Sequence, residues 1–145
     1  MIWRAAYQTR AAQSIDLPEL TPVYGTPVSD AHVLLGGFSF EALREIAIWQ
    51  RLIKADAPHW RPQIALFRSN WSPETLDQLV VLVPRSDLAK VILAADSDGS
   101  WQQLIQPARS TESFAARIEG RFATIVMKGL PTEEAWEAFL SNRLP

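Results

Sequence analysis

The sequence predicts an α+β fold, with a mostly antiparallel sheet of about five or six strands and two main helices packed on one face. Short apolar runs recur between turns that contain Pro and Gly, which is typical of strands. Two other stretches place apolar residues three and four positions apart, as amphipathic helices do. Consecutive strands lie close enough in the chain for antiparallel pairing. With 145 residues, the chain (1–145) is expected to form a single globular domain.

The N-terminal part of the chain is predicted to hold two strands separated by a loop. Ile2–Thr9 mixes aromatic, apolar and polar residues as a short strand does. Asp16–Asp30 contains three prolines and a glycine, a density that predicts a Pro-rich surface loop. Loops of this length are more often functional than short ones. Ala31–Phe38 reads as a buried strand that ends at Gly36-Gly37, where the backbone must turn or approach another group closely.

Phe40–Lys54 is the clearest helix in the sequence. Ser39 stands before it, in a position to cap the first turn. Charged and polar residues fill the positions outside its apolar face, which therefore predicts a core contact. The apolar positions are Leu43, Ile46, Trp49 and Ile53.

The next segment predicts a strand, a short helix and another strand. Gln63–Arg68 has the composition of a buried strand. Ser72 followed by Pro73 predicts a helix start, because the hydroxyl can accept from a free amide and proline suits the first helical position. We expect a short helix at 73–78 and a strand that ends at residue 83, since the four residues 80–83 are largely β-branched.

Two further strand pairs are predicted before the last helix. Leu88–Ala95 is an apolar run, and the turn Asp96–Gly99 is expected to join it to a strand that begins near Trp101. Residues 114–120 and 122–129 have the pattern of a β-hairpin.

The final helix is predicted to begin at Pro131 and Thr132, with Thr132 as its cap. Acidic residues in the first turn suit the helix dipole. We interpret the three acidic side chains as a charged outer face and a second candidate docking surface for a basic partner. They are Glu133, Glu134 and Glu137. The apolar stripe of this helix consists of Trp136, Phe139 and Leu140.

The composition excludes several kinds of chemistry. The absence of cysteine rules out disulfides, thiolate nucleophiles and cysteine-ligated metals. Sixteen acidic and fourteen basic residues leave a formal charge of −2, which disfavours a nucleic-acid partner. No apolar run is long enough for a membrane span or a signal peptide, so no membrane partner and a cytoplasmic location are expected.

No motif identifies a catalytic, metal or cofactor site. Asp96–Gly99 resembles the opening of a calcium loop, but no acidic residue follows near the twelfth position, and a solvated turn is the better interpretation. His32 and His59 have no partner at metal-ligand spacing, so we expect a hydrogen-bonded structural histidine and an exposed loop histidine. Gly36-Gly37 lacks the lysine and the spacing of a phosphate loop. No catalytic residue, metal or cofactor is therefore predicted.

Two tryptophans and two arginines stand near the ends of the strand 63–68. They are Trp60, Arg61, Arg68 and Trp71. Tryptophan and arginine are enriched among interface hot spots, which makes this set the candidate partner-binding surface, with core packing as the alternative. The six tryptophans of the chain and its lack of a catalytic set favour a non-enzymatic protein-binding module, of the inhibitor, immunity-protein or adaptor type. The partner would be another protein, and a homodimer stays open. The alternative is a small-ligand-binding domain, or an enzyme whose pocket is built from residues that match no recognised sequence motif (a non-signature pocket).

Overall fold

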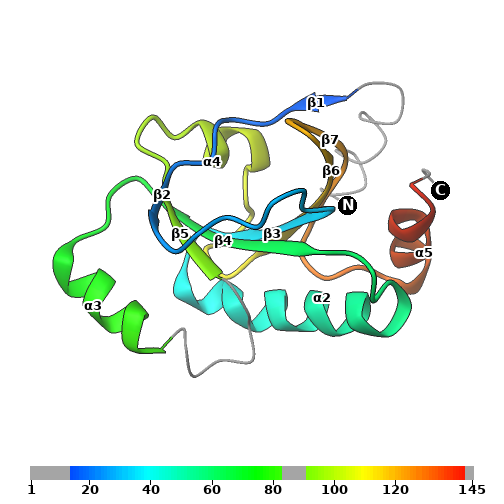
Figure 1. Ribbon diagram of the computed structural model, residues 1–145, viewed down its shortest axis with the longest axis horizontal. Coiled ribbons are helices and arrows are strands. Elements are labelled where there is room, and N and C mark those ends of the chain that lie inside the picture. The colour runs from blue at the N-terminus through cyan, green and yellow to red at the C-terminus, as the bar shows by residue number, and fades with distance from the viewer. Residues whose placement is uncertain (1–13, 83–90, 143–145) are drawn as a thin grey trace.

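A computed structural model, described here for residues 14–82 and 91–142, contains one sheet of seven strands in the order β1-β7-β6-β3-β4-β5-β2 (Figure 1). The strands are β1 (Ile15–Asp16), β2 (Pro22–Tyr24), β3 (Val33–Gly37), β4 (Pro62–Arg68), β5 (Val91–Ala95), β6 (Ser113–Glu119) and β7 (Phe122–Lys128). The helices are η1 (Phe40–Ala42), α2 (Leu43–Asp56), α3 (Pro73–Leu82), α4 (Ser100–Ile105) and α5 (Glu133–Ser141). The predicted α+β class is confirmed, while the sheet has seven strands instead of five or six.

The sheet is mostly antiparallel, as predicted, but its centre is parallel. Four strand pairs are antiparallel, namely β1 with β7, β7 with β6, β6 with β3, and β5 with β2. The neighbours β3, β4 and β5 run parallel, because α2 and α3 each carry the chain back to the starting edge. Strand β3 is therefore the boundary between a parallel and an antiparallel half.

Two strands that the sequence did not predict lie at the segment predicted as a Pro-rich loop: β1 ends at its first residue, Asp16, and β2 lies within it. Strand β1 covers only the first two residues of β7, and β2 pairs with β5 at the opposite edge of the sheet. Between them the chain crosses the sheet as irregular structure. The strand predicted at Ile2–Thr9 lies outside the described residues.

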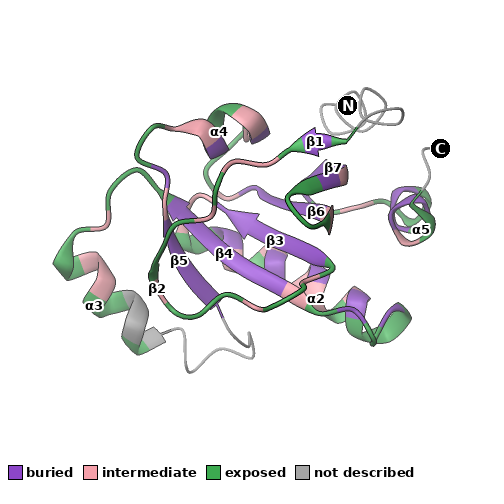
Figure 2. Ribbon diagram, turned by 45° about the horizontal axis from the view of Figure 1, so that its top comes forward, coloured by how far each residue is buried: buried purple, intermediate pink, exposed green. Residues whose placement is uncertain are grey.

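One face of the sheet is covered by the two main helices, as predicted. The core on this face joins the inward residues of the central strands to α2 and α5 (Figures 1 and 2). Trp49 of α2 is fully buried and lies edge-on to Trp136 of α5, with ring centroids 5.8 Å apart. The predicted start of the last helix is also confirmed, because the Thr132 hydroxyl accepts from the N–H of Ala135. The helix predicted at 40–54 is observed as η1 followed by α2.

The opposite face is covered by the short helix α4 and by the irregular chain between β1 and β2. Trp101 of α4 stacks on Phe67 of β4 with centroids 4.5 Å apart, and both rings are buried. Leu17 and Leu20 of the irregular segment pack partly against the same core. Six helical residues cover far less of a sheet than the helices of the first face do.

The prediction of a strand near Trp101 is wrong, because this segment is helix α4. The side chain of Asp96 stabilises the start of this helix. Its two carboxylate oxygens accept from the backbone N–H groups of Trp101, at 2.9 Å, and Gln102, at 3.1 Å. The turn Asp96–Gly99 therefore leads into a helix start and does not close a hairpin. The hairpin predicted at 114–120 and 122–129 is observed as β6 and β7.

The strand predicted to end at residue 83 is also absent within the described part, where α3 continues to Leu82. Ser72 caps this helix as expected, since its hydroxyl accepts from the N–H of Thr75 at 3.2 Å. Once a helix has started, each further residue adds a backbone hydrogen bond, and the weak preference of valine for strands is overridden. Ser39 behaves differently from its prediction: its hydroxyl donates to the carbonyl of Ser110 and does not cap the helix.

The Gly36-Gly37 pair allows close packing on both faces of β3. A methyl group at Gly36 would lie 2.4 Å from the ring of Phe114, and one at Gly37 would lie 2.3 Å from the Cβ of Ala42. Neither glycine has a positive φ, so the requirement is space and not backbone conformation. The predicted close approach at this point is confirmed.

We expect Gly37→Ala to lower the free energy of unfolding by about 1–3 kcal/mol, because the added methyl group overpacks the contact with Ala42. Chemical denaturation monitored by circular dichroism would measure the loss. Gly120→Asn is the control: Gly120 has φ 63° and no atom within 4 Å of the added carbon, and asparagine tolerates this conformation. Equal stability losses in the two variants would contradict the packing argument.

Trp49→Ala is expected to lower the free energy of unfolding by about 3–5 kcal/mol. The variant loses a fully buried ring and the hydrogen bond from the indole N–H to the carbonyl of Gly129 at 3.0 Å. Arg51→Ala, at an exposed position of the same helix, should change stability by less than about 0.5 kcal/mol. Wild-type unfolding of Trp49→Ala would show that α2 does not pack through this face.

Candidate functional site

The four residues of the predicted partner-binding surface do not form one surface. Strand β4 separates Trp60 and Arg61 from Arg68 and Trp71, because the two pairs flank its opposite ends. Trp60 is only 9% exposed and belongs to the core under α2 and α5. The guanidinium of Arg117 covers its ring at 4.6 Å from the centroid. Trp60 therefore offers little area to a partner.

Arg61 is exposed, but its polar groups form hydrogen bonds with the neighbouring turn. Its guanidinium donates to the carbonyl of Asp30 at 3.1 Å, and its backbone N–H donates to Nδ1 of His32 at 3.0 Å. His32 is therefore hydrogen-bonded, as predicted, although its side chain is exposed. His59 is exposed as well, which agrees with its prediction.

Arg68 and Trp71 lie together at the carboxyl end of β4. The Arg68 guanidinium stands 5.6 Å from the centroid of the Trp71 ring, within the range of a cation–π contact. The indole N–H of Trp71 donates to the carbonyl of Ala94 at 2.8 Å, which fixes the half-buried ring. In the predicted surface, this pair is the one place where a tryptophan and an arginine are accessible side by side.

The acidic residues of α5 occupy its outer side. Glu133, Glu134 and Glu137 are all exposed. Glu133 and Glu134 lie in the first turn, where the helix dipole favours negative charge. These side chains form a solvated surface and do not enter a cavity.

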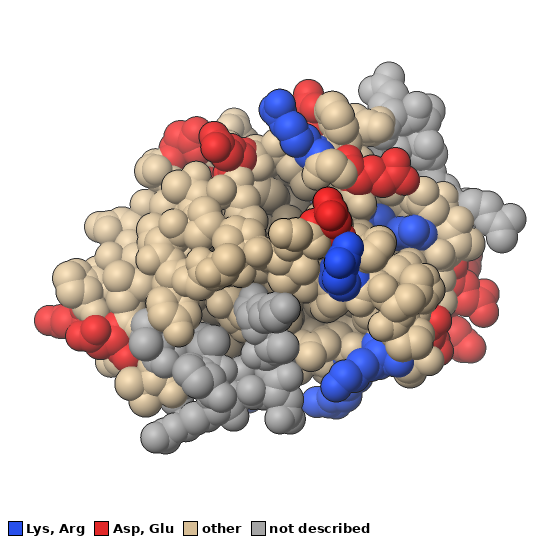
Figure 3. Space-filling view, viewed as in Figure 1, with Lys and Arg blue, Asp and Glu red and all other residues tan. Residues whose placement is uncertain are grey.

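A cavity of about 630 Å³ lies on the sheet face that α4 covers only in part. We call it the sheet-face pocket. Its floor is formed by Leu34, Gln63 and Ile118, which belong to β3, β4 and β6. Its walls are the segment between β1 and β2 and the segment between β2 and β3, and the hollow opens toward the viewer between them (Figure 3). A volume of this size suits a small organic molecule.

The lining of the floor and walls mixes apolar side chains with polar and charged groups. Leu17, Leu20 and Val28 line the walls. Gln63 is 3% exposed, and its side-chain oxygen accepts from the backbone N–H of Val28, so it ties the β2–β3 segment to the sheet. Three charged residues complete the lining, and they come from three different segments: Glu19, Asp30 and Arg121.

A smaller cavity of about 370 Å³ adjoins the sheet-face pocket and shares Glu19 and Trp101 with it. We call it the acidic pocket, because Asp96 and Asp98 also line it and no lysine or arginine does. Asp98 is exposed, and hydrogen bonds from the backbone N–H and the hydroxyl of Ser100 hold the pKa of its carboxyl below the usual range. Asp98 therefore stays ionised at neutral pH.

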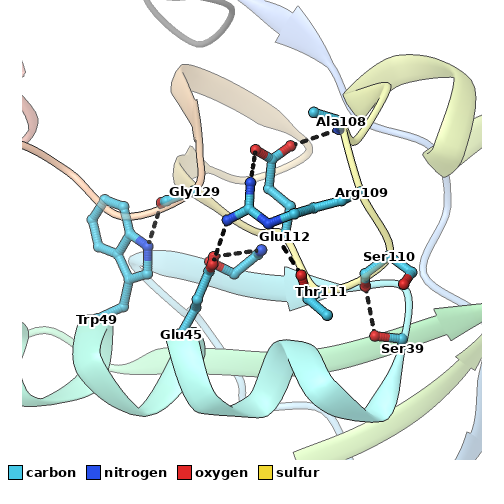
Figure 4. A network of polar contacts seen from close by, with 10 residues as sticks. Ser39, Glu45, Trp49, Ala108, Arg109, Ser110, Thr111, Glu112 and Gly129 are labelled. Carbon is cyan, nitrogen blue, oxygen red and sulfur yellow. Dashed lines mark hydrogen bonds and ion pairs between the residues drawn. The ribbon is translucent and has the colours of Figure 1, made fainter.

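A polar network fixes the connection between α4 and β6 (Figure 4). Arg109 bonds to Glu45 of α2 at 2.9 Å and lies 3.6 Å from Glu112. Glu45 also accepts from the N–H and the hydroxyl of Ser113, and Glu112 accepts from the N–H of Ala108. The carboxylates are used by partners within the chain, so the network positions a loop and offers no site for a ligand. Spacing in the sequence could not show this cluster, because Glu45 and Arg109 are 64 positions apart.

Metal and membrane sites find no support in the described residues. Across residues 14–82 and 91–142, no three His, Asp or Glu side chains are placed to hold a metal ion. None of the helices in these ranges combines the length and the apolar character that crossing a bilayer requires.

A scan against protein-family models gives no match, and a search of curated proteins finds no matching sequence. Function therefore has to be inferred from the geometry of the site.

Trp60→Ala and Trp71→Ala should differ in their effect on stability. We expect Trp60→Ala to cost about 3–5 kcal/mol, because it opens a cavity in the main core and removes the ring under Arg117. Trp71→Ala should cost less, since its ring is half-buried. Denaturant unfolding of both variants would measure the difference. A smaller loss of unfolding free energy for Trp60→Ala than for Trp71→Ala would contradict the assignment of Trp60 to the core and of Trp71 to the accessible surface.

Proposed function

We propose that this protein binds a small, largely apolar molecule in the sheet-face pocket. The observation that supports this proposal is the cavity of about 630 Å³, in which the apolar Leu34 and Ile118 lie beside the polar Gln63 and a few charged groups. Ligand sites in proteins are typically concave, mostly apolar and equipped with a small number of polar groups. The proposal follows the alternative drawn from the sequence, a small-ligand-binding domain.

The distribution of tryptophan favours a ligand over a flat protein interface. Four of the five tryptophans in residues 14–82 and 91–142 are buried within the sheet-and-helix cores, namely Trp49, Trp60, Trp101 and Trp136. Tryptophans that anchor a protein interface would stand exposed on the free surface. One of the buried rings, Trp101, lines the sheet-face pocket and gives it a rigid aromatic wall.

A protein-binding module is the second candidate function, and the accessible Arg68–Trp71 pair favours it. The ring and the guanidinium are both fixed in place, which lowers the entropy lost when a partner binds. Affinity capture from the native lysate, followed by reconstitution of any complex from purified components, tests this candidate. Loss of the complex in both Arg68→Ala and Trp71→Ala would support it, and an unchanged complex would exclude this surface.

The neutral apolar dye Nile red should bind saturably to the wild-type protein with increased fluorescence, because the pocket removes it from water. Ala31→Trp should abolish this binding, since Ala31 lines the pocket and an indole there fills it. Ala55→Trp is the matched control: Ala55 is exposed on α2, and the same substitution there should leave binding unchanged. Circular dichroism confirms that both variants fold. Equal dye binding by both variants would contradict the proposed site.

A further inference from the structure

We propose that the molecule bound in the sheet-face pocket is an organic amine, in which an apolar body carries an ammonium group. This inference rests on the proposed function and adds the chemical class of the ligand. The apolar body would occupy the pocket above Leu34 and Ile118. The ammonium group would lie toward Glu19 and Asp98, at the border with the acidic pocket.

Glu19 stands where the two cavities meet. It lines both of them, and its backbone carbonyl accepts from the indole N–H of Trp101 at 3.2 Å. Because Trp101 is buried and stacked on Phe67, this hydrogen bond fixes the backbone of Glu19. Glu19 therefore has a fixed backbone position at the border between the sheet-face pocket and the acidic pocket.

The carboxylates that line the acidic pocket differ in burial and in hydrogen bonding. Asp96 is 4% exposed, and both of its carboxylate oxygens accept hydrogen bonds from backbone N–H groups at the start of α4. It is therefore not available to a ligand. Asp98 and Glu19 are exposed, and no lysine or arginine lines the acidic pocket beside them. Two acidic side chains next to a cavity that apolar side chains line in part are complementary to an amphiphilic cation.

The basic groups near the sheet-face pocket lie away from this border. Arg121 belongs to the turn between β6 and β7, and Arg61 donates to the carbonyl of Asp30 on the β2–β3 segment. In the space-filling view, the side chains grouped over α4 are acidic, whereas basic and acidic side chains are mixed on the other side of the hollow (Figure 3). This asymmetry orients the ammonium group toward α4. An anionic ligand would have to point the opposite way, toward Arg121.

The test compares three ligands that share one tail: octylammonium, octanol and octanoate, titrated calorimetrically into the full-length protein. We expect octylammonium to bind at least about fivefold more tightly than octanol, and octanoate to bind most weakly. Added salt should weaken octylammonium alone. Tighter binding of octanoate, or equal binding of octylammonium and octanol, would overturn the amine assignment while leaving the pocket in place.

Substitutions of the two acidic residues test whether their charges contribute to the affinity for octylammonium. Glu19→Gln and Asp98→Asn should each weaken octylammonium by roughly fivefold and leave octanol unchanged. Both substituted side chains are exposed, and asparagine still accepts the hydrogen bond from Ser100, so folding is preserved. Glu133→Gln, on the exposed side of α5, is the matched control and should have no effect. Unchanged octylammonium binding in both pocket variants would refute the inference. Absence of any Nile red or octyl-ligand binding would refute the proposed function itself.

Discussion

Strand β3 constrains the whole fold, because it belongs to both halves of the sheet. It pairs in parallel with β4 on one side and antiparallel with β6 on the other, and all five of its residues are buried. Both of its faces must therefore be covered, one by the start of α2 and the other by the ring of Phe114. The two glycines make this double contact possible, since any larger residue would separate β3 from one of its neighbours.

The candidate site follows from an unequal covering of the two faces. Helices α2 and α5 have fourteen and nine residues and seal the first face with large aromatic rings. Within the described residues, the second face is covered by the six-residue α4 and by irregular chain between β1 and β3. Irregular chain cannot present a continuous row of side chains as a helix does, so a cavity remains over β3, β4 and β6.

The sequence predicted the elements that local patterns determine. Helix α2, the β6–β7 hairpin and the Thr132 cap depend on periodicity and on neighbouring residues, and all three are observed. The errors concern interactions over distance or between competing preferences. Asp96 begins a helix through two hydrogen bonds that its turn-like neighbours did not indicate, and β2 exists because β5 offers an unpaired edge.

The site itself lay beyond what single-sequence reasoning could supply. Glu19, Leu34, Gln63 and Ile118 are distant in the sequence and share no motif, so only the sheet order brings them together. The Pro-rich segment lines part of this cavity, and a long irregular stretch in a compact domain is often functional. Its prolines prevent the chain from forming a helix over the second face. The same residues that disrupt regular structure there thus leave open the cavity on which the proposed function depends.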